Sequence, residues 1–399
     1  MKQRVSTSKC MLLVGARQVG KSTLIKHEFK DFNRANFDDR LTRMQAKEEP
    51  KLFFLNNPKP LFIDEVQKES SILEDIKQIA DESDERGMFI LSGSQKLELM
   101  KGMSESLAGR VSISELTGLS MREIYGVKFN RHFIPTDAYI KEREKEMVKY
   151  DNIWEIIHKG SYPELYDIDR DWQEYYSSYV ATYLERDINE LVAADGITFT
   201  KFLTAVAART GELLNYSNIA GEVGVSEPTI KNWISILERT GIVYLLQPYS
   251  TSALKRAIKT PKLYFRDTGL ACYLTRWLTA DTLKCSAVAG NMFETFVVSE
   301  ILKSYSNEGK DYRFNIFYYR GKDRNASGEN EIDLVIEEDG VLYPVEIKMS
   351  GNPKASMGAT NQVLDKVSDK KRGLGVILCL IDKKTYLREN LVALPIEFI

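Results

Sequence analysis

Residues 15–22 read GARQVGKS, which fits the pattern G-x-x-x-x-G-K-[ST] of loops that bind nucleotide phosphates. The apolar run 10–14 before the loop has the length of a strand, and residues 23–27 read as the first turns of a helix. In such an arrangement the loop amides and the helix N-terminus point at one place, where a polyphosphate binds. The sequence therefore predicts a phosphate-binding loop that takes ATP.

Individual positions of this loop have expected roles. Gly15 and Gly20 let the backbone turn with its N–H groups inward, Lys21 reaches the β- and γ-phosphates, and the Ser22 hydroxyl ligates Mg²⁺. The residues predicted to surround the nucleotide are Gly15, Ala16, Arg17, Gln18, Val19, Gly20, Lys21, Ser22 and Thr23.

A second motif, KPLFIDE at 59–65, is a short apolar strand that ends in two carboxylates. We expect Asp64 to hold Mg²⁺ through water and Glu65 to orient and polarise the attacking water. A solvent-facing acidic pair is the alternative, but it is improbable for both residues behind a matching phosphate loop. Glu65 argues for hydrolysis, since a protein that only binds ATP has no need of a water-polarising carboxylate.

Two further positions complete the predicted catalytic set of Lys21, Glu65, Ser94 and Arg110. The strand 88–91 ends in SGSQ, where Ser94 is the best candidate to read the γ-phosphate and Gln95 is the alternative. Arg110 precedes a strand at 111–113 and could act as an arginine finger, in cis or on a neighbouring subunit. A surface salt bridge is the competing interpretation of Arg110.

The segment 213–249 has the order of a winged helix. A short helix at 217–223, a turn at 224–225, a longer helix capped by Ser226 and a strand from 242 follow one another. This motif places a recognition helix in the DNA major groove. The predicted wing is basic, which suits phosphate contacts better than base readout, although a structural or protein-contact role has equal weight. The basic residues of the wing are Lys255, Arg256, Lys259 and Lys262.

The last part of the chain holds a second candidate site. Segments 330–336 and 340–348 form a hairpin-like pair with Asp333 beside the E-x-K triplet of Glu346 and Lys348, which share one strand face. This resembles the restriction-endonuclease-like fold, which implies that Asp333 and Glu346 ligate metal and that Lys348 orients the water. An amphipathic helix at 292–297 offers Glu294 to complete the shell; Glu331 is a rival ligand and Glu300 a weaker substitute for Glu294. A scaffold without catalysis is the alternative.

Length and composition indicate a chain of two to three domains that resides in the cytoplasm. There are 399 residues, and the net charge of −2 gives no global attraction to nucleic acid or anionic lipid. The four cysteines are scattered, which predicts reduced thiols, and the three histidines are too far apart for a zinc site. No apolar run approaches the length of a membrane span, so no membrane contact is expected.

The segments GARQVGKST, FIDEVQ, LSGSQ and SLAGRVSISEL resemble the AAA-type ATPase domain of a large prokaryotic family, whose members carry a C-terminal domain of unknown function. The resemblance continues through KLYFRDTGLACYL to the final ALPIEFI. With the motifs above it implies an α/β protein. Its expected parts are a P-loop AAA-type domain with a parallel sheet (1–125), a helical lid or connector (126–205), a winged helix (206–265) and a restriction-endonuclease-like α/β domain (266–399). Within the connector, the charge run 141–149 is expected to form a solvated helix face or an inter-domain connection.

We therefore expect an Mg²⁺-dependent ATPase whose hydrolysis drives or licenses a C-terminal module that binds DNA or RNA, with nuclease activity left open. A homo-oligomer is a further expectation. One alternative is a nucleotide-gated switch that docks proteins through the winged helix and carries an inactive nuclease-like fold. A second is a structural module that holds nucleotide tightly with negligible turnover.

Overall fold

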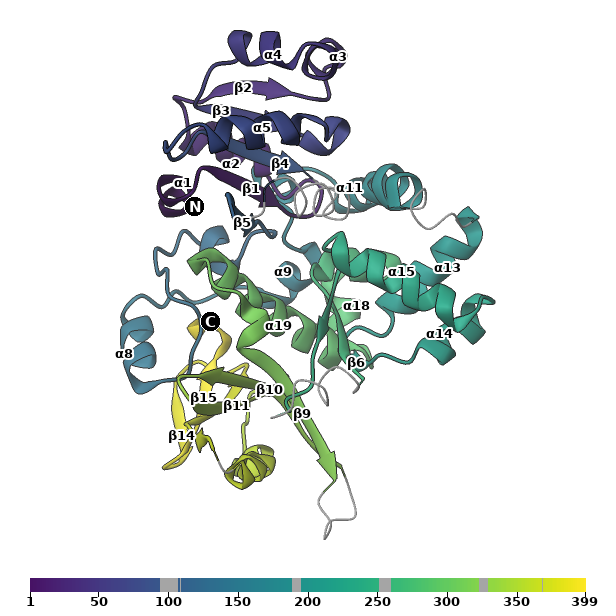
Figure 1. The fold of residues 1–399 in the computed structure, drawn as a ribbon. Helices are drawn as coiled ribbons and strands as arrows, with labels where there is room; N and C mark the ends of the chain where they lie inside the picture. Colours follow the sequence, from purple (N-terminus) through teal and green to yellow (C-terminus); the bar gives the residue numbers. More distant parts are fainter. Residues whose placement is uncertain (94–106, 108, 189–194, 251–259, 323–328, 368) are drawn as a thin grey trace. The chain divides into compact units, whose positions relative to one another are not determined.

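The computed structural model describes residues 1–93, 107, 109–188, 195–250, 260–322, 329–367 and 369–399 (Figure 1). Contacts divide the chain into two compact units, residues 1–118 with 239–241, and residues 119–238 with 242–399. Ser94 and Gln95 lie outside the described residues, and so do Lys255, Arg256 and Lys259 of the predicted wing. Among the helices that are described, none has both the length and the apolar character that crossing a bilayer requires.

The first unit is a parallel five-stranded sheet in the order β2-β3-β4-β1-β5. Its elements are α1 (Lys2–Thr7), β1 (Cys10–Val14), α2 (Lys21–Glu28), β2 (Asn33–Asn36), α3 (Arg40–Glu48), α4 (Pro50–Asn56), β3 (Leu61–Asp64), η1 (Val66–Glu69), α5 (Ile72–Asp81), β4 (Phe89–Gly93) and β5 (Val111–Glu115).

Strand β1 is apolar throughout because both faces of the sheet are covered. Successive side chains of a strand point to opposite faces. Leu12 and Val14 accordingly pack in one core with residues of α3, α4 and α5, whereas Met11 and Leu13 pack in the other with Ile25 of α2. The carboxyl ends of the parallel strands meet at one edge, where Val14 pairs with Gly93 and β3 ends at Asp64. This edge carries the phosphate loop.

The first part of the second unit, residues 119–188, is mainly helical. It comprises α7 (Met121–Ile124), α8 (Asp137–Lys145), α9 (Ile153–Lys159), α10 (Glu164–Asp167), α11 (Trp172–Tyr179) and the π-helical stretch η2 (Val180–Ile188). The charge run is not a wholly solvated face, however, because Arg143 is fully buried and its Nη1 donates to Glu146 O at 2.7 Å. Its guanidinium also lies over the Phe129 ring, at 5.5 Å from the centroid. A charge run in sequence does not reveal such a partner.

A three-helix segment and a small antiparallel sheet follow. The elements are α13 (Gly196–Ala207), β6 (Glu212–Leu213), α14 (Tyr216–Val223), α15 (Glu227–Arg239), β7 (Val243–Leu246) and β8 (Lys262–Phe265), with strand order β6-β8-β7. Gly224 ends α14 at φ 85°, and Ser226 Oγ accepts from Thr229 N at 3.3 Å at the start of α15. The order of elements is therefore the predicted one. Lys262 departs from its prediction, because it lies buried in β8 and is not an exposed wing residue.

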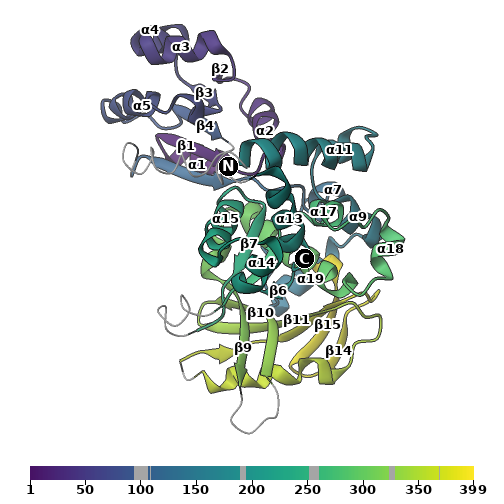
Figure 2. The same ribbon diagram turned by 90° about the vertical axis from the view of Figure 1, so that its right-hand side faces the viewer.

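The C-terminal sheet is mixed, with β11, β13 and β15 parallel and β10 antiparallel to β11, and α19 lies beside it (Figures 1 and 2). Most of α19 is buried, so the helix predicted as amphipathic is a core helix. The elements are α17 (Thr268–Leu274), α18 (Ala280–Lys284), α19 (Ala289–Glu308), η3 (Tyr312–Phe314), β9 (Ile316–Lys322), β10 (Glu329–Glu338), β11 (Val341–Lys348), η4 (Ala355–Lys366), β12 (Lys371–Arg372), β13 (Gly375–Cys379), β14 (Thr385–Arg388), β15 (Leu391–Pro395) and η5 (Ile396–Phe398).

Candidate functional sites

The phosphate loop between β1 and α2 requires glycine at both ends. A Cβ on Gly15 would lie 2.2 Å from the carbonyl oxygen of Leu116, so no other residue fits there without moving the backbone. Gly20 has φ 89°, in the left-handed region that favours glycine, and Gln18 within the loop has φ 65°. The loop is thus a tight turn that leads directly into the first residue of α2.

Lys21 lies folded onto the loop. Its side chain is buried, and its Nζ donates to the carbonyl oxygens of Gly15 at 3.0 Å and Ala16 at 2.8 Å. Burial lowers the pKa of Lys21 to about 8, against the opposing effect of the Glu65 and Asp64 carboxylates. A buried ammonium whose partners are uncharged carbonyls would gain from a phosphate anion, so the cradle fits a polyphosphate.

The two carboxylates after β3 are each held by a neighbour. Ser92 Oγ of β4 donates to Asp64 Oδ1, and both residues are buried. Glu65 is half-buried, adopts φ 55°, and accepts a hydrogen bond on Oε2 from Gln67 Nε2. A left-handed conformation is unusual for a glutamate and turns the chain sharply at this point. Sequence reasoning missed Ser92 and Gln67, although both stand inside the quoted motifs.

The remaining loop residues differ in exposure. Ala16 and Val19 are buried, Arg17 and Ser22 are half-buried, and Gln18 and Thr23 are exposed. Ser22 is in the first turn of α2, directly after Lys21. The structure therefore brings Lys21, Asp64 and Glu65 to the same edge of the sheet, with Ser22 beside them in sequence.

Arg110 lies at the opposite edge, which contradicts a role in cis. It precedes Val111, the partner of Cys10 at the start of β1, whereas the phosphate loop follows the end of β1. Five residues of strand separate the two edges, roughly 16 Å. Arg110 instead forms an ion pair with Asp81, whose Oδ2 lies 3.0 Å from Nη2, in agreement with the salt-bridge interpretation. A role on a neighbouring subunit stays a prediction.

The C-terminal candidate residues converge from two antiparallel strands. Lys348 Nζ lies 2.8 Å from Asp333 Oδ2 and 2.9 Å from Glu346 Oε2, and the backbone N–H of Ile347 donates to Asp333 Oδ2 at 2.8 Å. Asp333 and Glu346 are buried, while Lys348 is partly exposed. The register between β10 and β11, in which Leu334 pairs with Val345, brings Asp333 next to Glu346 and Lys348.

Glu346 and Asp333 together carry one more negative charge than Lys348 neutralises. Its Oε1 is buried without a hydrogen-bond partner. Burial, and secondly the Asp333 carboxylate, raise the pKa of Glu346 to about 8 against the effect of Lys348. A buried, unpaired carboxylate oxygen beside a second carboxylate is the kind of position that a divalent cation fills.

Glu294 forms a second cluster instead of joining the first. Its Oε1 accepts from Tyr264 OH at 2.6 Å and pairs with Lys262 Nζ at 3.2 Å, and the same ammonium lies 2.6 Å from Glu331 Oε1. Glu300 pairs with Lys303 at 2.8 Å and accepts from Met121 N, so it serves neither cluster. In the described part of the chain, no three His, Cys, Asp or Glu side chains are arranged to hold a metal together.

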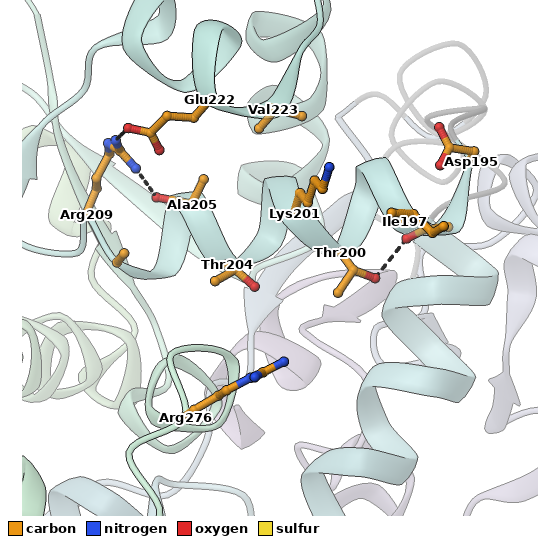
Figure 3. A pocket seen from close by; sticks show the side chains of 12 residues that line it. Asp195, Ile197, Thr200, Lys201, Thr204, Ala205, Arg209, Glu222, Val223 and Arg276 are labelled. Atoms are coloured by element: carbon orange, nitrogen blue, oxygen red, sulfur yellow. Dashed lines mark hydrogen bonds and ion pairs between the residues drawn. The ribbon is translucent and has the colours of Figure 1, made fainter.

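A separate groove of about 920 Å³ opens along α13 (Figure 3). Thr200, Lys201 and Thr204 of α13 line it together with Arg276, and Arg209 pairs with Glu222 at its end. None of the residues predicted from the sequence to bind or react lines this groove, so it adds nothing to either candidate site.

Comparison with known proteins identifies three segments. Residues 7–125 match a family described as AAA domain, residues 150–281 match a domain of unknown function, and residues 289–399 match a second domain of unknown function. The middle segment spans the expected boundaries at 205 and 265, which stay predictions.

Relatives over the whole chain are themselves uncharacterized. Uncharacterized proteins of Mycobacterium bovis and Mycobacterium tuberculosis are 26% identical over 375 residues, which is 92% of this chain and 76% of theirs. A Walker-type ATPase of Pyrococcus abyssi is similar in structure with a TM-score of 0.43 and 14% identity, over 68% of this chain and 93% of that one. The AAA match supports ATP binding and hydrolysis. The chain therefore combines an AAA-type ATPase domain with a C-terminal domain of unknown function.

Proposed function

We propose that residues 1–125 bind ATP with Mg²⁺ and hydrolyse it. The observation that carries the proposal is the meeting of three different groups at one edge of the parallel sheet: the cation of Lys21 on the loop, Asp64 held by Ser92, and Glu65 held by Gln67. A cation for the phosphates, a carboxylate for the metal and a second carboxylate for water make up the set that phosphoryl transfer to water needs.

Each residue has its own task in this proposal. Lys21 leaves the carbonyls of Gly15 and Ala16 to bind the phosphates, Ser22 and Asp64 hold Mg²⁺, and Glu65 leaves Gln67 to orient the water. The buried position of Asp64 and its fixed orientation by Ser92 fit a metal ligand. Mg²⁺ there neutralises phosphate charge.

Two substitutions separate binding from chemistry. Lys21→Ala should abolish ATP binding, measured with a fluorescent ATP analogue, because residues 15–22 contain no other lysine to bind the phosphates. Glu65→Gln should retain binding and lose phosphate release, because the amide cannot accept the proton of the water. Glu69→Gln, on the following 3₁₀ turn, is the matched control and should retain both. A Glu65→Gln protein that hydrolyses ATP at the wild-type rate would refute the assignment of Glu65.

A second function is favoured by the unpaired Oε1 of Glu346. We propose that residues 266–399 form a restriction-endonuclease-like domain that cuts nucleic acid with a divalent cation, and that residues 206–265 form a winged helix that contacts phosphates. Asp333 and Glu346 would hold the ion, which activates water and offsets charge on the cleaved phosphate. Lys348 would orient that water. Residues 126–205 would connect this module to the ATPase, whose turnover drives or licenses it.

Cleavage assays test this second function. The full chain should cut DNA or RNA with Mg²⁺ or Mn²⁺, and Lys348→Ala should abolish cutting while ATP hydrolysis persists. Lys370→Ala, which removes a lysine paired with Glu337 of the same β10, is the control and should still cut. A wild-type chain that is inert on single- and double-stranded substrates, with and without ATP, would leave a protein-docking switch as the better description.

A further inference from the structure

Lys262 is a buried lysine of the second unit that neither proposed function uses. It is 3% exposed, although lysine is rarely buried without anionic partners. It begins β8 of the small antiparallel sheet, within the segment 150–281, yet both of its ion-pair partners belong to the C-terminal domain. These partners are Glu294 of α19 and Glu331 of β10.

Glu294 is held by two side chains of β8, Lys262 and Tyr264. Glu294 Oε1 takes both the Lys262 ammonium at 3.2 Å and the Tyr264 hydroxyl at 2.6 Å, and Tyr264 is itself buried on β8. Two side chains of one strand therefore hold the glutamate that the sequence suggested as a metal ligand. Releasing it to a metal would leave a buried ammonium with a single carboxylate partner, which is costly.

The charges of the two clusters also limit what the site can accept. Asp333 lies between them, since it pairs with Lys348 and interacts electrostatically with Lys262 and Glu294. The four carboxylates Asp333, Glu346, Glu294 and Glu331 face the two ammonium groups, so two negative charges remain when all six groups are ionised. One divalent cation balances them, and a second would leave an excess of buried positive charge.

We propose that Lys262 is a built-in cation of the C-terminal site, which withholds Glu294 and Glu331 from metal and limits the site to one divalent ion, held by Asp333 and Glu346. The inference rests on the proposed metal-dependent function. It also gives the small sheet a chemical role, because the segment that precedes the C-terminal domain supplies this cation.

The test counts Mn²⁺ ions bound to the full chain by electron paramagnetic resonance, without nucleotide and in a Lys21→Ala background that disables the ATP site. The expected stoichiometry is one ion per chain, and two ions in Lys262→Met, which frees Glu294 and Glu331 as ligands and halves the excess positive charge that a second ion would leave. Lys262→Arg, which retains the charge, and Lys370→Met, which removes the lysine paired with Glu337, should each bind one ion. Thermal melting verifies that each variant is folded.

A second variant covers the case in which Lys262→Met does not fold. Glu294→Gln should change Mn²⁺ affinity by less than about twofold, whereas Asp333→Asn should weaken it by at least about tenfold. Three results would overturn the role of Lys262 without overturning the metal site. They are one Mn²⁺ ion in folded Lys262→Met, two ions in the parent, or a loss of Mn²⁺ affinity in Glu294→Gln equal to that in Asp333→Asn. A parent chain that binds no Mn²⁺ at this site would overturn the proposed metal site together with the inference.

Discussion

Replacing Ser92 by alanine tests whether Asp64 is a positioned metal ligand. The Ser92 hydroxyl is fully buried and donates to Asp64 Oδ1, to which the backbone N–H of Glu65 also donates at 3.2 Å. A hydrogen bond to a charged group contributes about 1.5–3 kcal/mol. Ser92→Ala should therefore lower the unfolding free energy by about this amount and leave Asp64 free to rotate away from the metal.

The free energy of this hydrogen bond also determines how far the Mg²⁺ dependence of ATP hydrolysis should shift. Since about 1.4 kcal/mol corresponds to tenfold, the Mg²⁺ concentration for half-maximal ATP hydrolysis should rise roughly 10- to 100-fold. ATP binding measured in the presence of a chelator should change little, because it depends on the loop amides and Lys21.

Ser114 provides a closely matched control for Ser92, because the strand register places both serines beside the same residue of β1. Ser114 of β5 and Ser92 of β4 both pair with Leu13, on either side of β1, but Ser114 accepts from Arg4 Nη1 at 3.1 Å instead of contacting Asp64. Ser114→Ala should retain the wild-type Mg²⁺ dependence, measured as phosphate release over a Mg²⁺ titration. If Ser92→Ala also retained it while Asp64→Asn did not, the positioning role of Ser92 would be refuted.

Two further predictions concern the loop and a buried histidine. Gly15→Ala should weaken ATP binding by at least about 100-fold, because the new Cβ would lie 2.2 Å from Leu116 O. Gly221→Ala, where a Cβ meets open space, is the control and should bind ATP normally. Unchanged ATP binding in Gly15→Ala would show that the loop adapts. Burial lowers the pKa of His158 below its usual 6.5, although its Nε2 hydrogen-bonds with Trp277 O at 2.8 Å. The unfolded chain therefore binds more protons than the folded chain in mildly acidic solution, and stability falls as the pH falls below about 6.5. The free energy of unfolding in urea should fall less between about pH 7.5 and about pH 5.5 for His158→Gln than for the wild type or for His27→Gln, which changes an exposed histidine. Equal losses of unfolding free energy in all three proteins would contradict this assignment to His158.

The order of elements could be predicted because it depends on local patterns. The apolar run before Gly15 is β1, the segment after Ser226 is α15, and the pair of strands around Gly340 is β10 with β11. The position of Arg110 relative to the phosphate loop also follows from a local pattern. A residue before a parallel strand lies at the opposite edge from residues that follow such strands, so its distance from the phosphate loop follows from its position alone.

Burial of charge could not be predicted in the same way. Arg143 lies in a charge run and Lys262 in a basic segment, so both were expected to face solvent, yet both are buried. Their partners come from elsewhere in the chain or from aromatic and backbone groups that composition does not reveal. A lone charged residue is exposed by default, and only a partner in the fold changes that outcome.

The sequence by itself determined the chemistry of the phosphate loop. Glycine, lysine and serine at fixed spacing act through their own backbone and through the helix that follows, so Gly15, Lys21 and Ser22 needed no distant partner to be recognised. The sequence also grouped Lys348 with Asp333 and Glu346, but the tertiary structure alone decided that Lys262 pairs with Glu294 and Glu331. Strand register and the packing of α19 set these distances, and electrostatic energy depends on distance in space, whatever the separation along the chain.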